Sequence, residues 1–147
     1  MIIIAPYNKK HIPYDLLLEA DPEKDNVDNY LLKGLLFGAY DYDVLAGVYI
    51  IIEKEDYIFE LVNLSVKEDY QRKGIGKILI SHAENQAKLL GGKHMEIGTA
   101  FPLVPYYEKQ GYSYYKTIKN FFVDNYSAPV IDKGILLKDM EVLRKEI

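Results

Sequence analysis

The chain has 147 residues, of which 49% are hydrophobic, so it is long enough for one domain and too short for two ordinary ones. A net charge of −4 argues against a nucleic-acid partner, because binding a phosphate backbone normally requires a positive face. The absence of cysteine excludes disulfides, thiol nucleophiles and thiolate metal sites, and it favours a cytoplasmic protein. We therefore expect one domain over residues 1–147.

Neither a membrane segment nor a metal site is predicted. The apolar start, Met1 to Ala5, stops at Pro6 and is far shorter than the roughly 20 apolar residues that span a bilayer. The three histidines, His11, His82 and His94, are far apart in the sequence and have no ligand-like neighbours. We expect no membrane partner and no bound metal.

The first half of the chain predicts a strand, two helices and the start of a β-meander. Hydrophobic patterning predicts, in chain order, a strand at residues 1–5, helices at 12–19 and 27–33, and strands at 35–40, 44–53 and 57–66. Asp41-Tyr42-Asp43 is typical of a hairpin turn. Strict alternation along the last of these strands predicts that residues 62, 64 and 66 share one face and residues 61, 63 and 65 the other.

The second half begins with the best helix of the sequence. An apolar stripe through Ile75, Leu79 and Ala83 predicts a helix over residues 74–90, which the glycines at 91 and 92 end. Then follow a predicted strand at 93–99, a short helix at 103–110, a strand at 111–123, an irregular segment at 124–133 and a final strand at 134–143. This order of elements predicts an α+β fold.

The connection between the 57–66 strand and the 74–90 helix is the most informative segment. The first amides of a helix have no partner within it, and the helix dipole makes that end electropositive. Gly74 and Gly76 leave room for a ligand, and cations at positions 72, 73 and 77 add positive charge. The segment therefore predicts a phosphate site.

Two familiar phosphate loops do not fit this segment. In the Walker A pattern a glycine would replace Gln71, and a metal-binding hydroxyl would replace Ile78. The dinucleotide fingerprint requires a third glycine where Leu79 stands. A small ATP- or GTP-binding protein is therefore the weakest hypothesis.

The segment resembles the acyl-CoA loop of the GNAT family of N-acetyltransferases. That loop reads Gln/Arg-x-x-Gly-x-Gly/Ala after a strand ending Leu-x-Val; here residues 64–66 read Leu-Ser-Val and residues 71–76 read Gln-Arg-Lys-Gly-Ile-Gly. Residues 107–112, Tyr-Glu-Lys-Gln-Gly-Tyr, are similar to the family's late Tyr-x-Lys-x-Gly-Phe segment. The resemblance implies one GNAT-like α+β domain with a mixed, mostly antiparallel, twisted sheet of about six to seven strands flanked by about four helices.

The resemblance also implies an acetyl-CoA-dependent N-acetyltransferase. Acetyl-CoA would be the co-substrate, without a metal, and a primary amine of a small molecule or protein would accept the acetyl group directly. In the family the diphosphate lies on the loop amides and the pantetheine arm pairs with the central strand. Many members carry an asparagine where Ala100 stands here, so either Thr99 takes over its contact or the contact is missing. The implied cofactor-binding residues are Leu64, Ser65, Val66, Gln71, Arg72, Lys73, Gly74, Ile75, Gly76, Lys77 and Thr99.

Two side chains are candidates for the chemistry. Glu60 occupies the position of the general-base glutamate in the histone-acetylating branch of the family, and a solvent-facing strand carboxylate is the alternative interpretation. Tyr107 matches the tyrosine that protonates the departing thiolate in many members, although the adjacent Tyr106 leaves the register open. A phenol with a pKa near 10 is a weaker acid than a thiol near 8.5, so we expect only limited help from Tyr107.

The acceptor is expected to meet residues 21–30 and 121–133, which lie outside the motifs. Acidic residues there would favour a cationic acceptor if they line the mouth of the site, although exposed carboxylates are the norm; they are Glu23, Asp25, Asp28, Asp124 and Asp132. An aromatic-rich late strand could pair across a two-fold axis, so a homodimer is compatible with the sequence. The alternative function is a catalytically silent acyl-CoA sensor or interaction module.

Overall fold

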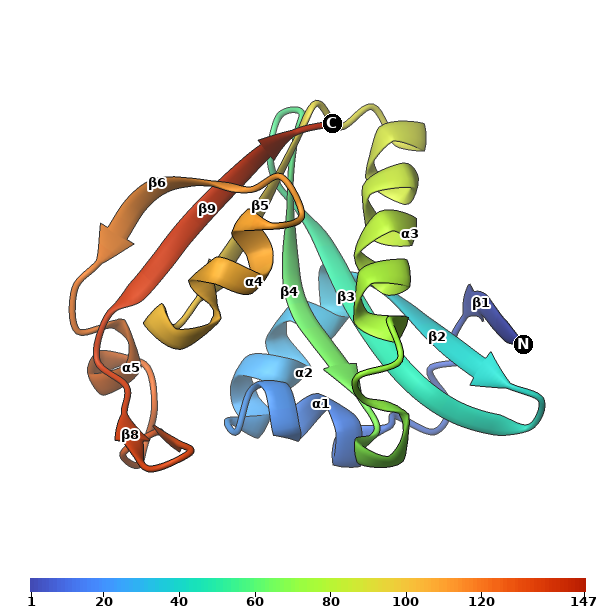
Figure 1. The fold of residues 1–147 in the computed structure, drawn as a ribbon, viewed down its shortest axis with the longest axis horizontal. Helices are drawn as coiled ribbons and strands as arrows, with labels where there is room; N and C mark the ends of the chain where they lie inside the picture. The colour runs from blue at the N-terminus through green and yellow to red at the C-terminus, as the bar shows by residue number, and fades with distance from the viewer.

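The protein is built on a seven-stranded sheet, seen in a computed structural model that describes residues 1–147 (Figure 1). The strand order is β1-β2-β3-β4-β5-β9-β6, and only β4 and β5 pair in parallel. The strands are β1 (Ile2–Pro6), β2 (Leu35–Asp41), β3 (Val44–Glu55), β4 (Ile58–Val66), β5 (His94–Thr99), β6 (Ser113–Ile118) and β9 (Met140–Glu146).

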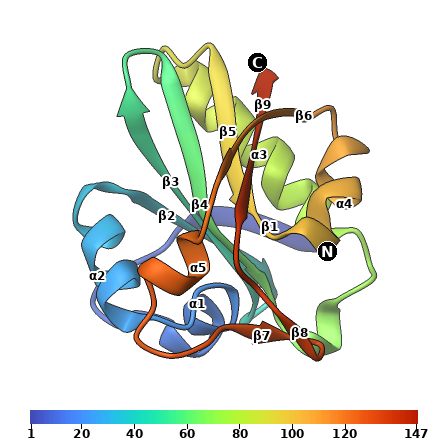
Figure 2. The ribbon, with the colours of Figure 1, turned by 90° about the vertical axis from the view of Figure 1, so that its left-hand side faces the viewer.

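Helices cover both faces of this sheet. Figure 2 shows α1 (Tyr14–Ala20) and α2 (Lys24–Lys33) on one side and α3 (Ile75–Leu89) on the other. Two shorter helices, α4 (Val104–Glu108) and α5 (Phe121–Asp124), lie in the connections around β6, and 3-10 turns precede α3 at Glu68–Tyr70 and α4 at Phe101–Leu103. None of the helices is long and apolar enough to cross a membrane.

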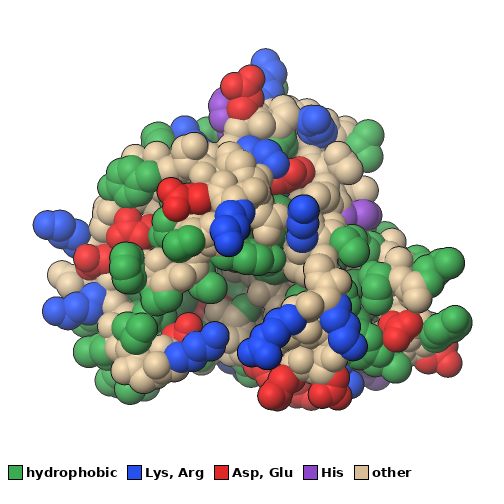
Figure 3. Space-filling model, viewed as in Figure 1, with side chains coloured by type: hydrophobic (Ala, Val, Ile, Leu, Met, Phe, Trp, Pro, Cys, Tyr) green, Lys and Arg blue, Asp and Glu red, His purple; other side chains and the backbone are tan.

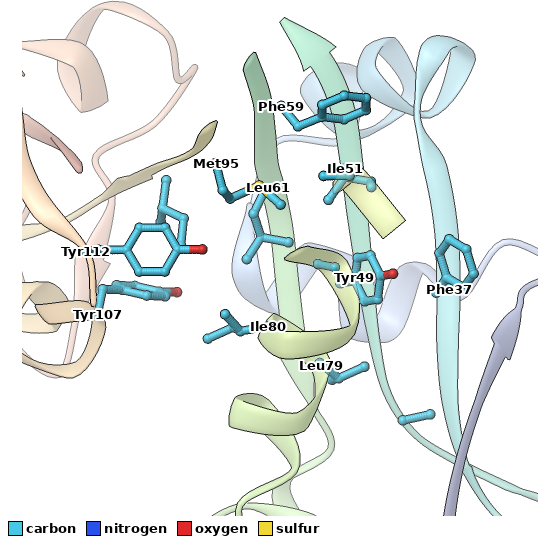
Figure 4. Close-up of a cluster of buried hydrophobic side chains, with 14 of the residues drawn as sticks. Phe37, Tyr49, Ile51, Phe59, Leu61, Leu79, Ile80, Met95, Tyr107 and Tyr112 are labelled. Atoms are coloured by element: carbon cyan, nitrogen blue, oxygen red, sulfur yellow. The ribbon is translucent and has the colours of Figure 1, made fainter. Parts of the chain in front are cut away.

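The apolar run in β3 is explained by burial on both faces. Val48 and Ile50 pack toward α1 and α2, whereas Tyr49 and Ile51 pack toward α3. All four side chains are fully buried. In Figure 4, Tyr49 lies near Leu79 of α3, and Ile51 lies farther along the strand, near Leu61 and Phe59. Because alternate residues of a strand point to opposite faces, a strand between two helical layers needs a continuous apolar sequence.

The predicted α+β class, with its mixed and mostly antiparallel sheet, is confirmed, and there are five α-helices where about four were expected. The hairpin turn also lies where it was predicted, between the end of β2 at Asp41 and the start of β3 at Val44. Most other boundaries agree to within two residues; α2 begins three residues before its predicted start, and α4 ends at Glu108, two residues before its predicted end.

Two predictions near the C-terminus are wrong. The predicted strand over residues 111–123 ends at Ile118, because Asn120 takes a left-handed φ of 59° and the next residues form α5. The predicted strand over residues 134–143 is divided. Its start, β8 (Ile135–Leu136), pairs with β7 (Ile131–Asp132) across a turn in which Lys133 and Gly134 have φ values of 49° and 80°. The main sheet resumes only with β9 at Met140.

Candidate active site

A β-bulge bends the central strand β4. Ile50 of β3 is opposite Asn63, and the next residue, Ile51, is opposite Leu61, so Val62 has no partner. The predicted alternation is therefore wrong: Leu61 and Leu64 both pack toward α3, whereas Asn63 bonds to the main chain of α1. Such a bulge disturbs pairing and bends the strand that carries it.

Beyond the bulge, β4 separates from β5. Their parallel pairing runs from Ile58 opposite His94 to Leu61 opposite Ile97 and then stops. β4 continues to Val66 with its β5 side unpaired, while β5 pairs with β9. Both strands line a cavity of about 510 Å³ at this opening. Figure 3 shows a hollow near the middle of this face, with Lys and Arg side chains around it.

The turn between β4 and α3 presents a row of free main-chain donors. The amide N–H groups of residues 72 to 77 donate to no acceptor in the protein. Arg72 and Gly74 have left-handed φ values of 61° and 81°, and Gly74 is the N-cap of α3. With the positive end of the helix dipole behind them, these amides form a site for an anion.

A second cavity, of about 450 Å³, lies in front of these amides. Its charged lining consists of Arg72, Lys77 and Lys109, without a carboxylate. A Cβ built on Gly76 would lie 2.7 Å from the Tyr106 hydroxyl, so glycine keeps this space open. Sequence reasoning missed Lys109 and Tyr106 as lining residues, although both lie in or beside the Tyr-x-Lys-x-Gly segment that it singled out.

The structure divides the predicted cofactor residues between the two cavities. The 450 Å³ cavity is lined by Val66, Gln71, Arg72, Gly74, Ile75, Gly76 and Lys77, and the 510 Å³ cavity by Leu64 and Thr99. Ser65 and Lys73 line neither; the Lys73 ammonium lies 5.5 Å from the centre of the Tyr70 ring. The Gln71 side chain donates to the Val66 carbonyl at 2.9 Å and so joins the turn to the end of β4.

Both predicted catalytic side chains line the 510 Å³ cavity. Tyr107 lines it together with Glu60, whereas Tyr106 lines the 450 Å³ cavity in front of the turn. Burial raises the pKa of Tyr107 to about 12. In Figure 4 the rings of Tyr107 and Tyr112 lie side by side, but only the Tyr112 hydroxyl is held by a carboxylate, Glu84, at 2.7 Å.

Glu60 lies beside a buried ionic network. It is opposite Glu96 of β5, which is 1% exposed and accepts hydrogen bonds from Lys54, at 2.6 Å, and from Arg144. Burial raises the pKa of Glu60, and the negative charge of Glu96 acts in the same direction, while Lys54 opposes them. Glu60 is therefore a stronger base than an exposed glutamate, and it makes no ion pair of its own.

The far wall of the 510 Å³ cavity comes from the two segments expected to meet the acceptor. Residues 19–30 and 121–132 both contribute to it, and Ser127 joins them by donating to Glu23 at 2.8 and 2.9 Å. Figure 2 shows α5 beside α1 and α2. Of the five acids expected at the mouth only Asp132 lines the cavity; Asp28, for example, pairs with Lys24 on the surface instead. No three His, Asp or Glu side chains are grouped as a metal site would require.

A helix N-terminus with free amides, next to a strand with an open edge, suits a ligand that has a diphosphate and an extended arm. Residues 5–112 match the family model described as the acetyltransferase (GNAT) family. The chain belongs to the GNAT family of acetyltransferases. The family resemblance seen in the sequence is thereby confirmed, and the protein is an acyltransferase.

Relatives of this GNAT protein span nearly its whole length. It is 41% identical over 130 residues to the uncharacterized N-acetyltransferase YvbK of Bacillus subtilis (strain 168), which covers 86% of this chain and 84% of the relative. A GNAT acetyltransferase from Elizabethkingia anophelis with acetyl-CoA bound has a TM-score of 0.95 at 36% identity, covering 99% and 98% of the two chains. A Bacillus subtilis acetyltransferase in complex with CoA has a TM-score of 0.92 at 36% identity, covering 100% and 99%.

Proposed function

We propose that this protein transfers the acetyl group of acetyl-CoA directly to a primary amine bound in the 510 Å³ cavity. The observation that carries the proposal is the run of free amides at residues 72–77, placed at the end of the strand that also carries Glu60. The homologous structures with acetyl-CoA or CoA bound support the choice of co-substrate.

The residues present fit a CoA diphosphate at the turn. The free amides supply directed hydrogen bonds, and Arg72, Lys77 and Lys109 supply charge without a competing carboxylate. The pantetheine arm would lie along the unpaired edge of β4 between Val62 and Val66 and donate to or accept from its main chain. The arm would then point the thioester toward the cavity that holds Glu60.

The transfer needs a neutral amine. An alkyl amine with a pKa near 10.4 is neutral only about once in 2,500 at pH 7, a cost of roughly 4.6 kcal/mol. The amine nitrogen forms a bond to the thioester carbon, the carbon–sulfur bond breaks, and the electron pair leaves on sulfur. Glu60 accepts the amine proton, directly or through a water, and its raised pKa makes it better suited to this task than an exposed carboxylate.

Tyr107 assists the leaving sulfur by hydrogen bonding. Because its pKa is about 12 and that of a thiol is about 8.5, full proton transfer to the thiolate is uphill by about 5 kcal/mol. The thiolate therefore takes its proton from solvent or from the amine once it has reacted, and the phenol stabilises the developing charge. Tyr107 therefore accelerates the transfer less than an acid whose pKa matched that of the thiol would.

The test has two stages. Isothermal titration should detect acetyl-CoA binding, and absence of binding at millimolar concentration would remove the proposal. A panel of polyamines, aminoglycosides, amino acids and N-terminal peptides is then incubated with acetyl-CoA, and acetylated products are identified by mass spectrometry. We expect product with at least one amine, and much slower formation by Glu60→Gln. Binding without any product would instead favour the silent sensor.

A further inference from the structure

The wall of the 510 Å³ cavity that lies away from the CoA seat, the turn at residues 72–77, contains a buried carboxylate that has no cationic partner. Asp21, which follows α1, is 9% exposed and lines the 510 Å³ cavity. Its hydrogen-bond donors are neutral and include the Tyr30 hydroxyl at 3.3 Å and the Glu23 main-chain N–H at 3.4 Å. No ion pair of the molecule includes Asp21. Buried carboxylates are normally paired, because an uncompensated charge away from water is costly.

An amide oxygen without a hydrogen-bond partner lies in the same network as this carboxylate. Asn63 is 3% exposed and lines the same cavity; its Nδ2 donates to the Leu17 carbonyl at 2.9 Å and to the Tyr30 hydroxyl at 2.8 Å. Its Oδ1 has no hydrogen-bond partner. The same Tyr30 hydroxyl donates to Asp21, so one tyrosine links the Asn63 side chain to the Asp21 carboxylate. An ammonium group, with three donors and a positive charge, matches such a cluster.

The remaining lining of the cavity favours cations as well. Its charged side chains are all carboxylates and include no Lys, Arg or His; they are Glu19, Asp21, Glu60 and Asp132. Aromatic rings complete the wall near Asp21, where Phe122 and Tyr126 stack with their centroids 5.7 Å apart. Aromatic faces attract cations, particularly where water is excluded. An anionic or neutral acceptor would leave these groups uncompensated.

The buried cluster is separate from the catalytic carboxylate but lies on the same face of the sheet. Glu60 is flanked by Phe59 and Leu61, which pack toward α3, so Glu60 faces the α1 side, as Asn63 does. Three residues of strand separate Glu60 from Asn63, which corresponds to roughly 10 Å. One ligand can therefore reach both groups if it carries two nitrogen centres at about this separation.

We propose that the acceptor is a small primary amine with a second cationic group, of the α,ω-diamine or polyamine class, and that Asp21, Asn63 and Tyr30 bind this second group. The inference rests on the proposed function and deepens it by naming the class of acceptor. The reacting amine loses its proton near Glu60, whereas the distal ammonium keeps its charge beside Asp21. The positive charge of this distal ammonium compensates the buried Asp21 carboxylate, which a monoamine cannot do while its single amine reacts near Glu60.

The first test uses the unmodified protein with acetyl-CoA and matched pairs of acceptors. Diamines from 1,4-diaminobutane to 1,8-diaminooctane are compared with the 1-aminoalkanes of equal carbon number. We expect kcat/KM to be at least about 10-fold higher for the diamine, with the largest ratio at the longer chains. Equal values for diamine and monoamine would overturn this inference alone. Failure to acetylate any amine would overturn the proposed function and the inference together.

The second test removes the buried charge. Asp21→Asn should lower kcat/KM for the best diamine by at least about 10-fold and leave the monoamine within about twofold. Asp25→Asn makes the same change of charge at an exposed residue that has no hydrogen bond and does not line the cavity, so both acceptors should stay within about twofold. Acetyl-CoA affinity, measured by titration calorimetry, reports whether each variant is folded.

A third variant covers the case in which Asp21→Asn does not fold. Tyr30→Phe removes only the hydroxyl that links Asn63 to Asp21, and it should lower the diamine-to-monoamine ratio by about 3-fold to 10-fold. An unchanged ratio in folded Asp21→Asn, or in Tyr30→Phe if the former is unfolded, contradicts the assignment.

Discussion

The strongest prediction concerns the two left-handed glycines that flank α3. Gly74, at its start, has a φ of 81°, and Gly91, just after its end, has a φ of 91°; a Cβ on either would meet nothing within 4 Å. An alanine at either position therefore costs about 1 to 2 kcal/mol of backbone strain and nothing in packing. The two positions differ in one respect, because only Gly74 belongs to the turn that presents free amides.

For Gly74→Ala, we expect weaker acetyl-CoA binding. If the free turn relaxes to relieve its strain, that strain must be restored on binding, so about 1 to 2 kcal/mol raises Kd by roughly 5-fold to 30-fold. Gly91→Ala should lose about as much stability while leaving Kd within about twofold. Isothermal titration with acetyl-CoA gives both Kd values, and urea unfolding with saturating acetyl-CoA shows whether the bound forms carry equal strain.

Two outcomes of the comparison between Gly74→Ala and Gly91→Ala would contradict this prediction. A wild-type Kd for Gly74→Ala, together with a stability loss smaller than that of Gly91→Ala, would mean that the turn has relaxed without affecting binding and that it does not bind the cofactor. Equal weakening by both substitutions would mean that α3 transmits general strain and that the free amides have no special part.

Three further predictions follow from the buried groups. Tyr107→Phe should lower kcat by about 10-fold to 100-fold with little change in KM for acetyl-CoA, whereas Tyr112→Phe, at a residue that is 2% exposed, should lower the unfolding free energy but leave kcat within about twofold. Because burial raises the pKa of Glu60 and the carboxylate is the active form, kcat/KM should rise with pH along a limb centred above the ordinary value of 4.5, and a limb unchanged in Glu60→Gln would contradict this role. Burial alone would raise the pKa of Glu96, but its two cationic partners outweigh burial and lower it, so the pairing stabilises the fold above pH about 4.5 and is lost as pH falls further. Glu96→Gln should therefore cost about 3 to 5 kcal/mol at pH 7 in urea unfolding, and a cost that does not shrink in acid would refute the linkage.

The parts of the site that are local in sequence could be predicted from it. The anion turn needs only a strand, two glycines and a helix start, and Gly74 and Gly76 identified it without tertiary information. The family resemblance indicates Glu60, by its position along one strand, and Tyr107, by a short motif. Each of these signals lies within a single connection or element.

The acceptor cavity could not be predicted in the same way, because its walls meet only in the folded chain. Asp21 was not singled out among the acids, since nothing in the sequence shows that a tyrosine from α2 and an asparagine from β4 surround it. The bulge at Val62 was also missed, because a bulge adds one residue to a strand without altering its composition. The separation of β4 from β5 begins at this bulge, so it was not predicted either.

The bond between Ser127 and Glu23 joins segments 104 residues apart, and both lie outside the stretch that forms the CoA seat. Under the proposed function, acetyl-CoA is held by the end of β4, the turn before α3 and Lys109, whereas most of the acceptor cavity comes from the segments 19–30 and 121–132, which include surface loops. We therefore expect substitutions in these two segments to change the amine that is accepted while the free amides before α3 are kept. Evolutionary diversification of this scaffold should therefore be concentrated in those loops, with the turn before α3 left intact.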